Sequence, residues 1–270
     1  MTHLWLTLLT MFFGISQDQY ARLSPEVKVF LALAHGYVND VPIVRSDIRD
    51  KEFPLQNWVQ RRIQAAGLSF EPPGRLKYPD FLLTGHPCGF EVKGLSFPGR
   101  WVDFDCNSQL PLAEHGGRKV FYIFGRYPKE ATANEYPVHD LVLCAASFLN
   151  TETYNANKNQ NFKGAGSYGD IKVRDRRMYI CKTPFSLASG TVGDITLILE
   201  SPTTNVPDIL VPVGDLDRRE ADDLVTGYAF DLQNNRLTTQ RVPNPNSTSV
   251  HRFTAYKIGT SSRTPVSLIS

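Results

Sequence analysis

The sequence has no long hydrophobic run, no large excess of charge of either sign and few cysteines. An apolar stretch at residues 4–13 (LWLTLLTMFF) is about ten residues long, too short to span a bilayer. The net charge of +2 excludes a histone-like polycation but permits a protein that gathers its positive charge in one cleft. The four cysteines lack CxxC and zinc-ligand spacing, which predicts reduced, buried thiols in a cytoplasmic protein.

The stretch at residues 4–13 resembles the apolar part of a signal peptide. No Lys or Arg precedes it, however, and no small-x-small cleavage site follows it cleanly. We therefore expect a buried N-terminal helix and a protein without a membrane association. An exported binding protein is the alternative that this stretch leaves open.

Composition favours a folded chain rich in turns. Hydrophobic residues make up 41% of the sequence and charged residues 21%, which supports a packed core. Eighteen prolines and nineteen glycines favour a mixed α/β fold over a helical bundle. The length of 270 residues suits one large domain. We find no internal repeat, phosphate-binding loop, GxSxG motif or dinucleotide fingerprint.

Hydrophobic periodicity predicts helices in the first quarter of the chain and strands after it. We expect two helices within residues 1–38 and an amphipathic helix over residues 54–66, ended by Gly67. Short apolar runs bounded by Gly and Pro predict strands at residues 68–70, 76–83, 89–95, 119–127, 140–145, 195–199 and 225–232.

Charged side chains interrupt two neighbouring strands in the segment YPDFLLTGHPCGFEVKG, residues 78–94. Because side chains alternate between the faces of a strand, Glu91 and Lys93 point away from the core while their neighbours point towards it. If the two runs pair as a hairpin, Asp80 lies beside Glu91. Two carboxylates and an ammonium group would then meet at one place on an apolar sheet.

Two adjacent carboxylates repel each other, and a divalent cation would remove that cost. Mg²⁺ prefers oxygen ligands and takes one or two carboxylates, with water and phosphate completing its shell. We predict Asp80 and Glu91 as ligands, with the backbone carbonyl of Val92 as a third. Lys93 would orient the attacking water or stabilise the transition state. The opposing interpretation is an edge hairpin with a surface ion pair.

Pro79-Asp80, a ten-residue interval and then Glu91-Val92-Lys93 resemble the signature of the PD-(D/E)xK nuclease superfamily. The order of helix, strand, strand and buried strand in residues 50–145 is also similar to that family's core. The resemblance implies an α/β fold with a restriction-endonuclease-like core, a central mixed β-sheet flanked by α-helices. It implies catalysis by Asp80, Glu91 and Lys93 with Mg²⁺.

Within the superfamily, the chain looks like a type II restriction endonuclease. Such an enzyme is a homodimer that cleaves double-stranded DNA at a short specific sequence and functions with a cognate DNA methyltransferase. A single catalytic domain would comprise an N-terminal helical part (1–50), the core (51–145) and a part for DNA recognition and dimerisation (146–270). The alternatives are a DNA repair or structure-selective nuclease with the same three residues and a non-catalytic DNA-binding protein with this fold.

Further polar residues are candidates for supporting roles. The family often has an extra acid on the upstream helix, for which Glu52 is available, and Gln56 and Gln60 follow one and two turns later. The polar stretch at residues 150–170 predicts a functional loop. Side chains suited to phosphates or base edges make up the candidate DNA contacts: Asn107, Ser108, Gln109, Lys119, Lys163, Lys172, Arg174, Arg176 and Arg177.

Overall fold

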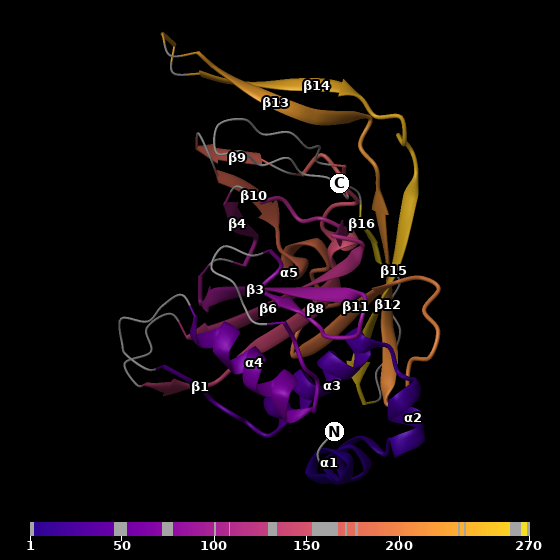
Figure 1. Ribbon diagram of the computed structural model, residues 1–270. Coiled ribbons are helices and arrows are strands. Elements are labelled where there is room, and N and C mark those ends of the chain that lie inside the picture. The colour runs from indigo at the N-terminus through magenta and orange to yellow at the C-terminus, as the bar shows by residue number, and fades with distance from the viewer. Residues whose placement is uncertain are drawn as a thin grey trace.

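The protein is mixed α/β, with a large mixed sheet flanked by a few helices (Figure 1). This computed structural model describes residues 3–45, 53–71, 78–99, 101–107, 109–128, 134–152, 167–170, 172–175, 178–231, 233–234, 236–259 and 266–268.

Nine strands of the described residues form the central sheet. Eight follow the order β16-β12-β15-β11-β8-β6-β3-β2, and β5 pairs with β6. Their bounds are β2 Phe81–Leu82, β3 Cys88–Phe97, β5 Glu114–His115, β6 Arg118–Pro128, β8 Asp140–Ala145, β11 Ile195–Glu200, β12 Leu210–Arg219, β15 Val250–Ile258 and β16 Val266–Leu268. Parallel pairs (β3 with β6, β8 with β11) alternate with antiparallel ones, so the sheet is mixed.

The middle of this sheet is covered on both faces. All six residues of β8 are buried, and β11 is buried over its first five. A strand packed on both sides has no solvent face, which is why these segments are nearly continuous hydrophobic runs.

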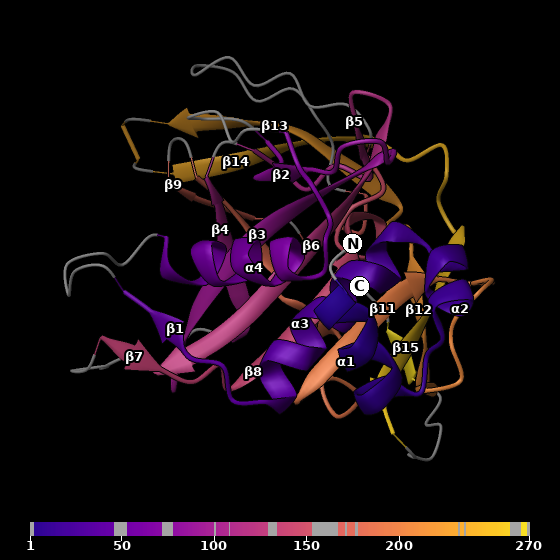
Figure 2. The ribbon, with the colours of Figure 1, turned by 60° about the horizontal axis from the view of Figure 1, so that its bottom comes forward.

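Helices cover one face. The described helices of the N-terminal part are α1 His3–Phe13, α2 Gln17–Arg22, α3 Pro25–Val38 and α4 Pro54–Ala65. Figure 2 shows α3 and α4 in front of the strands. Gly125 of β6 permits the close approach of α4, because a Cβ there would lie 2.8 Å from the Leu55 side chain. Helix α4 therefore packs on the face to which Gly125 belongs.

The opposite face carries a three-stranded sheet and a short helix. The strands are β4 Asp103–Asn107, β10 Met178–Lys182 and β9 Lys172–Asp175, in the order β4-β10-β9, and the helix is α5 Pro184–Leu187. The ring of Phe104 packs on Tyr122 and Phe124, with centroids 6.1 and 4.9 Å away. The face that bears Tyr122 and Phe124 is thus covered by β4.

A two-stranded ribbon extends from the molecule, which we call the arm (Figure 1). It consists of β13 Asp223–Asp231 and β14 Arg236–Pro243, paired with each other in a separate sheet. The backbone amide of Asn244 donates to the Asp222 carbonyl at 2.8 Å and closes the base. A second small pair joins β1 Ile43–Val44 to β7 Glu135–Tyr136, and a 3-10 turn, η1, spans Ala146–Phe148.

The helix and hairpin predictions agree with the structure at most positions. The helix predicted at residues 54–66 is α4, with Gly67 in the left-handed region at φ 72°, and the hairpin is β2–β3. The helix predicted at residues 4–13 is α1, which buries Trp5, Leu9 and Phe13. Among the described residues, no helix combines the length and apolarity needed to cross a membrane.

Three local predictions were wrong. Residues 1–38 hold a third helix, α2, because Ser16 and Gln19 form a capping box that begins a separate turn. The strand predicted at residues 68–70 is a single bridge between Phe70 and Leu83. Residues 103–107, where we predicted no strand, form β4 because they pair with β10. All four cysteines are buried and none forms a disulfide.

Candidate active site

The hairpin register brings Asp80 beside Glu91. Phe81 pairs with Phe90 and Leu82 with Gly89, so Asp80 precedes β2 directly opposite Glu91. The backbone amide of Asp80 donates to Glu91 Oε2 at 3.2 Å. The predicted juxtaposition of the two acidic residues is therefore present.

The Asp80 carboxylate lies at the edge of β3 and accepts hydrogen bonds on both oxygens. The backbone amide of Val92 donates to Oδ2 at 2.8 Å, and the side-chain amide of Gln56, on α4, donates to Oδ1 at 3.2 Å. These two donors fix the orientation of the carboxylate. Within a strand the amide and carbonyl of one residue point to the same side, so the Val92 carbonyl also lies on the Asp80 side.

Lys93 completes the cluster. Its Nζ donates to Glu91 Oε1 at 2.7 Å, and the side chains are 23% and 11% exposed, respectively. Burial lowers the pKa of Lys93, but the Glu91 and Asp80 carboxylates raise it by more, so the ammonium stays protonated. The cluster consequently holds one fixed positive charge beside two acids.

The electrostatics of Asp80 indicate a site with more acidic groups than positive charges. Burial and the neighbouring Glu91 raise the pKa of Asp80 to about 7, against the opposing effects of the Val92 amide and Lys93. A divalent cation that bound beside this carboxylic acid would displace its proton to the solvent. The site thus favours binding of a further positive ion.

Two tyrosines that the sequence interpretation missed lie on the same face. Tyr122 of β6 is in register with Glu91, and its hydroxyl donates to the Tyr78 hydroxyl at 3.3 Å. Burial raises the pKa of both phenols, so both stay neutral. Tyr78 directly precedes Pro79-Asp80, but only the register of β3 with β6 brings Tyr122 there.

The cluster offers carboxylate and carbonyl oxygens, the kind of ligand that Mg²⁺ takes. Among the described residues, no group of three or more His, Cys, Asp or Glu side chains could hold a metal ion. Mg²⁺ needs only one or two carboxylates, and each carboxylate oxygen here keeps acceptor capacity beyond its one internal hydrogen bond. The carboxylates of Asp80 and Glu91 and the carbonyl oxygen of Val92 are the groups that would hold the Mg²⁺ ion.

The structure positions the other candidates in several places. Gln60 lies one turn beyond Gln56 on α4 and is half-buried. Gln109 is half-buried, and its amide donates to the Leu110 carbonyl at 2.9 Å. Lys172 and Arg174 belong to β9 and Asn107 ends β4, but their side chains are outside the described part. Outside the described residues altogether lie Glu52, Ser108, Lys163, Arg176 and Arg177.

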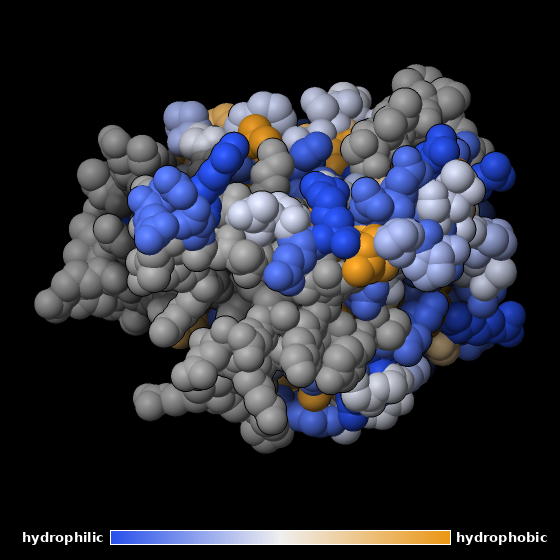
Figure 3. Space-filling view, turned by 90° about the horizontal axis from the view of Figure 1, so that it is seen from above, coloured by the Kyte–Doolittle hydropathy of each residue, from blue (hydrophilic) through white to orange (hydrophobic). Residues whose placement is uncertain are grey.

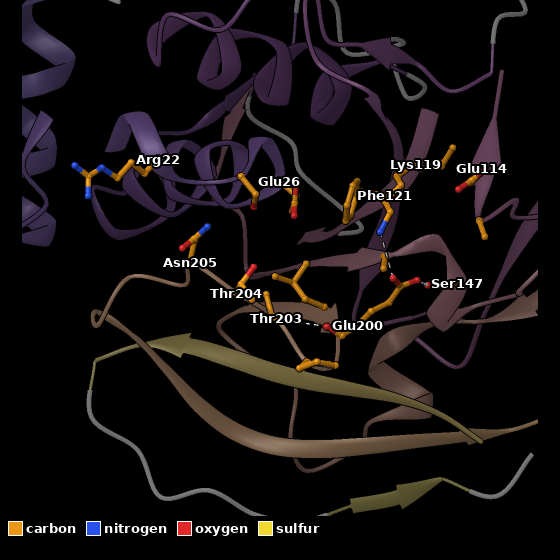
Figure 4. Close-up of a pocket in the computed structure, with 16 residues that line it drawn as sticks. Arg22, Glu26, Glu114, Lys119, Phe121, Ser147, Glu200, Thr203, Thr204 and Asn205 are labelled. Atoms are coloured by element: carbon orange, nitrogen blue, oxygen red, sulfur yellow. Dashed lines mark hydrogen bonds and ion pairs between the residues drawn. The ribbon is translucent and has the colours of Figure 1, made fainter. Parts of the chain in front are cut away.

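Lys119 is on the other face of the sheet. It is in register with Cys88, three residues before Glu91, so the two side chains point in opposite directions. Figure 4 shows it at a pocket of about 600 Å³, where its Nζ lies 3.5 Å from Glu200 Oε2. Ser147 also donates to Glu200, at 2.5 Å. Lys119 is therefore part of a different surface from Asp80 and Lys93.

Only the ends of the predicted functional loop at residues 150–170 are described. Ser167 bonds to the Asn150 side chain, and Asp170 pairs with the buried Arg218 at 2.7 Å. Both ends are thus anchored to the core, whereas residues 153–166 lie outside the described part.

Comparisons of this chain with models of protein families, with curated proteins and with solved structures find no match.

Proposed function

We propose that this protein is a Mg²⁺-dependent endonuclease that hydrolyses phosphodiester bonds in double-stranded DNA. The observation that carries the proposal is the meeting of Asp80, Glu91 and Lys93 within hydrogen-bonding distance, with an Asp80 pKa of about 7. In a surface hairpin with an ordinary ion pair, Glu91 alone would pair with Lys93. Such a hairpin would not explain a second, half-buried acid, Asp80, beside them.

Each residue has a distinct role in this proposal. Asp80 and Glu91 would hold Mg²⁺, which would offset charge on the phosphate and make the attacking water more acidic. The Val92 amide and Gln56 hold the Asp80 carboxylate in place. The Lys93 ammonium, fixed by Glu91, orients the water and stabilises the negative charge that develops on the phosphate.

The finer assignment is a type II restriction endonuclease with a restriction-endonuclease-like core, acting as a homodimer alongside a DNA methyltransferase. Supporting it are the helix–strand–strand order of α4, β2 and β3, the next core strand β6, and additional surface outside this core. Site-specific cleavage needs protein surface that reads bases, and the arm supplies such surface.

The proposal is tested by digesting long unmethylated DNA with the wild-type protein, with Mg²⁺ or with EDTA, beside Glu91→Gln. We expect discrete fragments that require Mg²⁺ and disappear in the variant. A smear or nicking alone would support the repair or structure-selective nuclease. Binding without cleavage on several DNAs would support the non-catalytic DNA-binding protein.

The arm is the described surface best suited to DNA outside the catalytic cluster. A two-stranded ribbon fits the major groove. β14 exposes Arg236, Thr238, Thr239, Gln240 and Arg241, all of which can bond to phosphates or base edges. Figure 3, which views the molecule from above, shows mainly hydrophilic side chains among the described residues of that face. The arm lies on the same side as β9 in Figures 1 and 2.

We expect the double substitution R236A/R241A to weaken DNA binding about tenfold or more. The plot of the logarithm of the binding constant against the logarithm of the salt concentration should become less steep by about two. The measurement is a salt titration of binding in EDTA. Excising residues 224–242 with a glycine linker serves as the control, since Asp223 and Pro243 are paired neighbours at the arm's base. If the protein without the arm folds and binds DNA with unchanged affinity, the arm does not take part in recognition.

A further inference from the structure

A second cavity lies where β3 and β6 end, on the same face as Glu91 and Lys93. It has a volume of about 460 Å³ and is lined by Phe97, Trp101, Arg126 and Phe185. Phe97 follows Lys93 by four residues on β3, and Arg126 is in register with Leu95. Since side chains alternate, Lys93, Phe97 and Arg126 share one face.

The lining consists of flat surfaces. The guanidinium of Arg126 lies 4.4 Å from the ring centroid of Phe185 and 5.1 Å from that of Phe97. Phe97 is 38% exposed and Trp101 44% exposed, so both rings are open to a ligand. Aromatic rings and guanidinium planes are the surfaces on which unpaired nucleobases stack.

The charge in this cavity is already neutralised. Arg126 Nε donates to both oxygens of the buried Asp140, at 2.8 and 2.9 Å, and Nη2 also bonds to Oδ2. A cation held in this way, against the rings of Phe97 and Phe185, offers little net charge to an anion. The cavity therefore suits an uncharged planar ring rather than a phosphate or a carboxylate.

The backbone that carries Trp101 is fixed. The Thr183 amide donates to the Val102 carbonyl at 2.9 Å, and the Thr183 hydroxyl donates to the Trp101 carbonyl. These bonds join Trp101 to α5, which carries Phe185. Both acceptors are main-chain carbonyls, so substitution of the Trp101 side chain leaves these hydrogen bonds in place.

We propose that this aromatic cavity binds an unstacked nucleobase of the DNA strand whose phosphate lies at Lys93. Four residues along a strand separate Phe97 from Lys93, a span of about 13 Å. That span is about four base steps of a stacked strand. The proposal rests on the proposed nuclease function for the identity of the ligand, while the cavity's own chemistry specifies a planar ring.

Tryptophan fluorescence tests the proposal directly. All three tryptophans are described; Trp5 and Trp58 are 2% and 0% exposed, so Trp101 is the one that a ligand can reach. Wild-type protein is titrated in EDTA with a single-stranded oligonucleotide and with an abasic oligonucleotide of the same length. We expect quenching by the first and not by the second.

Fluorescence anisotropy of a labelled oligonucleotide measures the affinity of the variants. Trp101→Ala should weaken binding of the base-containing strand by about 5- to 100-fold, and Trp101→Phe should restore most of it. Equal quenching by the abasic strand, or unchanged affinity in Trp101→Ala, would overturn the proposal. A Trp101 signal that changes with protein concentration alone would overturn it in favour of contact with a second copy.

Cleavage of duplex DNA in Mg²⁺ by the wild-type protein separates this proposal from the nuclease function. Cleavage without base-dependent quenching would overturn the nucleobase cavity and leave the nuclease standing. Base-dependent quenching without cleavage would support the cavity and count against the nuclease.

Discussion

Replacing Lys93 with alanine is expected to slow Mg²⁺-dependent DNA cleavage by about 10²–10³-fold, the usual loss when one donor to a developing negative charge is removed. The reason is geometric. The Lys93 ammonium bonds to Glu91 at 2.7 Å and is only 23% exposed, so its charge acts where little water screens it. Single-turnover cleavage at saturating protein measures the chemical step.

Two further variants make this experiment specific. Lys257→Ala removes a lysine of similar exposure, 26%, which also pairs with a carboxylate, that of Asp194. It should cleave at the wild-type rate. Lys93→Gln keeps a hydrogen-bond donor near Glu91 but no charge, and should be as slow as Lys93→Ala while remaining folded. Wild-type cleavage rates in both Lys93 variants would show that Lys93 and Glu91 form an ordinary ion pair without a role in cleavage.

Asp80→Asn is expected to stabilise the metal-free protein at pH 8 by about 4 kcal/mol and to have little effect near pH 4. In the folded protein, burial and Glu91 raise the pKa of Asp80 from 3.8 to about 7. Between these values the folded state binds a proton that the unfolded state has lost, so stability falls as pH rises. Asparagine has no proton to lose and avoids that cost.

Urea unfolding in EDTA from pH 4 to pH 8 measures the difference between Asp80→Asn and the wild type. Mg²⁺ supplies the control: added at pH 8, it should stabilise the wild type by binding the folded state and should leave the variant unchanged. A variant that is less stable than the wild type at pH 8 would show that Asp80 is a structural acid, held mainly by the Val92 amide.

The cluster of Asp80, Glu91 and Lys93 was predictable because its geometry is local. Asp80 and Glu91 belong to one hairpin with a short Gly/Pro connection, and Lys93 is two residues from Glu91 on the same strand. Alternation of side chains and the pairing of adjacent strands determine their meeting. Helix α4 was equally predictable, since its apolar period and its terminal Gly67 are both in the sequence.

The register between strands that are distant in the sequence could not be predicted from side-chain alternation and hairpin pairing. β3 and β6 are separated by twenty residues, and their alignment places Tyr122 beside Glu91 and turns Lys119 to the opposite face. A shift of one residue would exchange those faces. Packing of α4 against Gly125 and of Phe104 against Tyr122 accompanies this register, and neither contact follows from periodicity.

The sequence by itself determined the two acids, the lysine and the helix before them, because spacing along a strand or helix dictates which neighbours share a face. Only the tertiary structure decided that Gln56 reaches Asp80, that β13 and β14 form a separate arm, and that Phe97, Arg126 and Phe185 enclose one cavity. These arrangements depend on how distant segments pack, and that packing is selected by the shape and burial of the whole core.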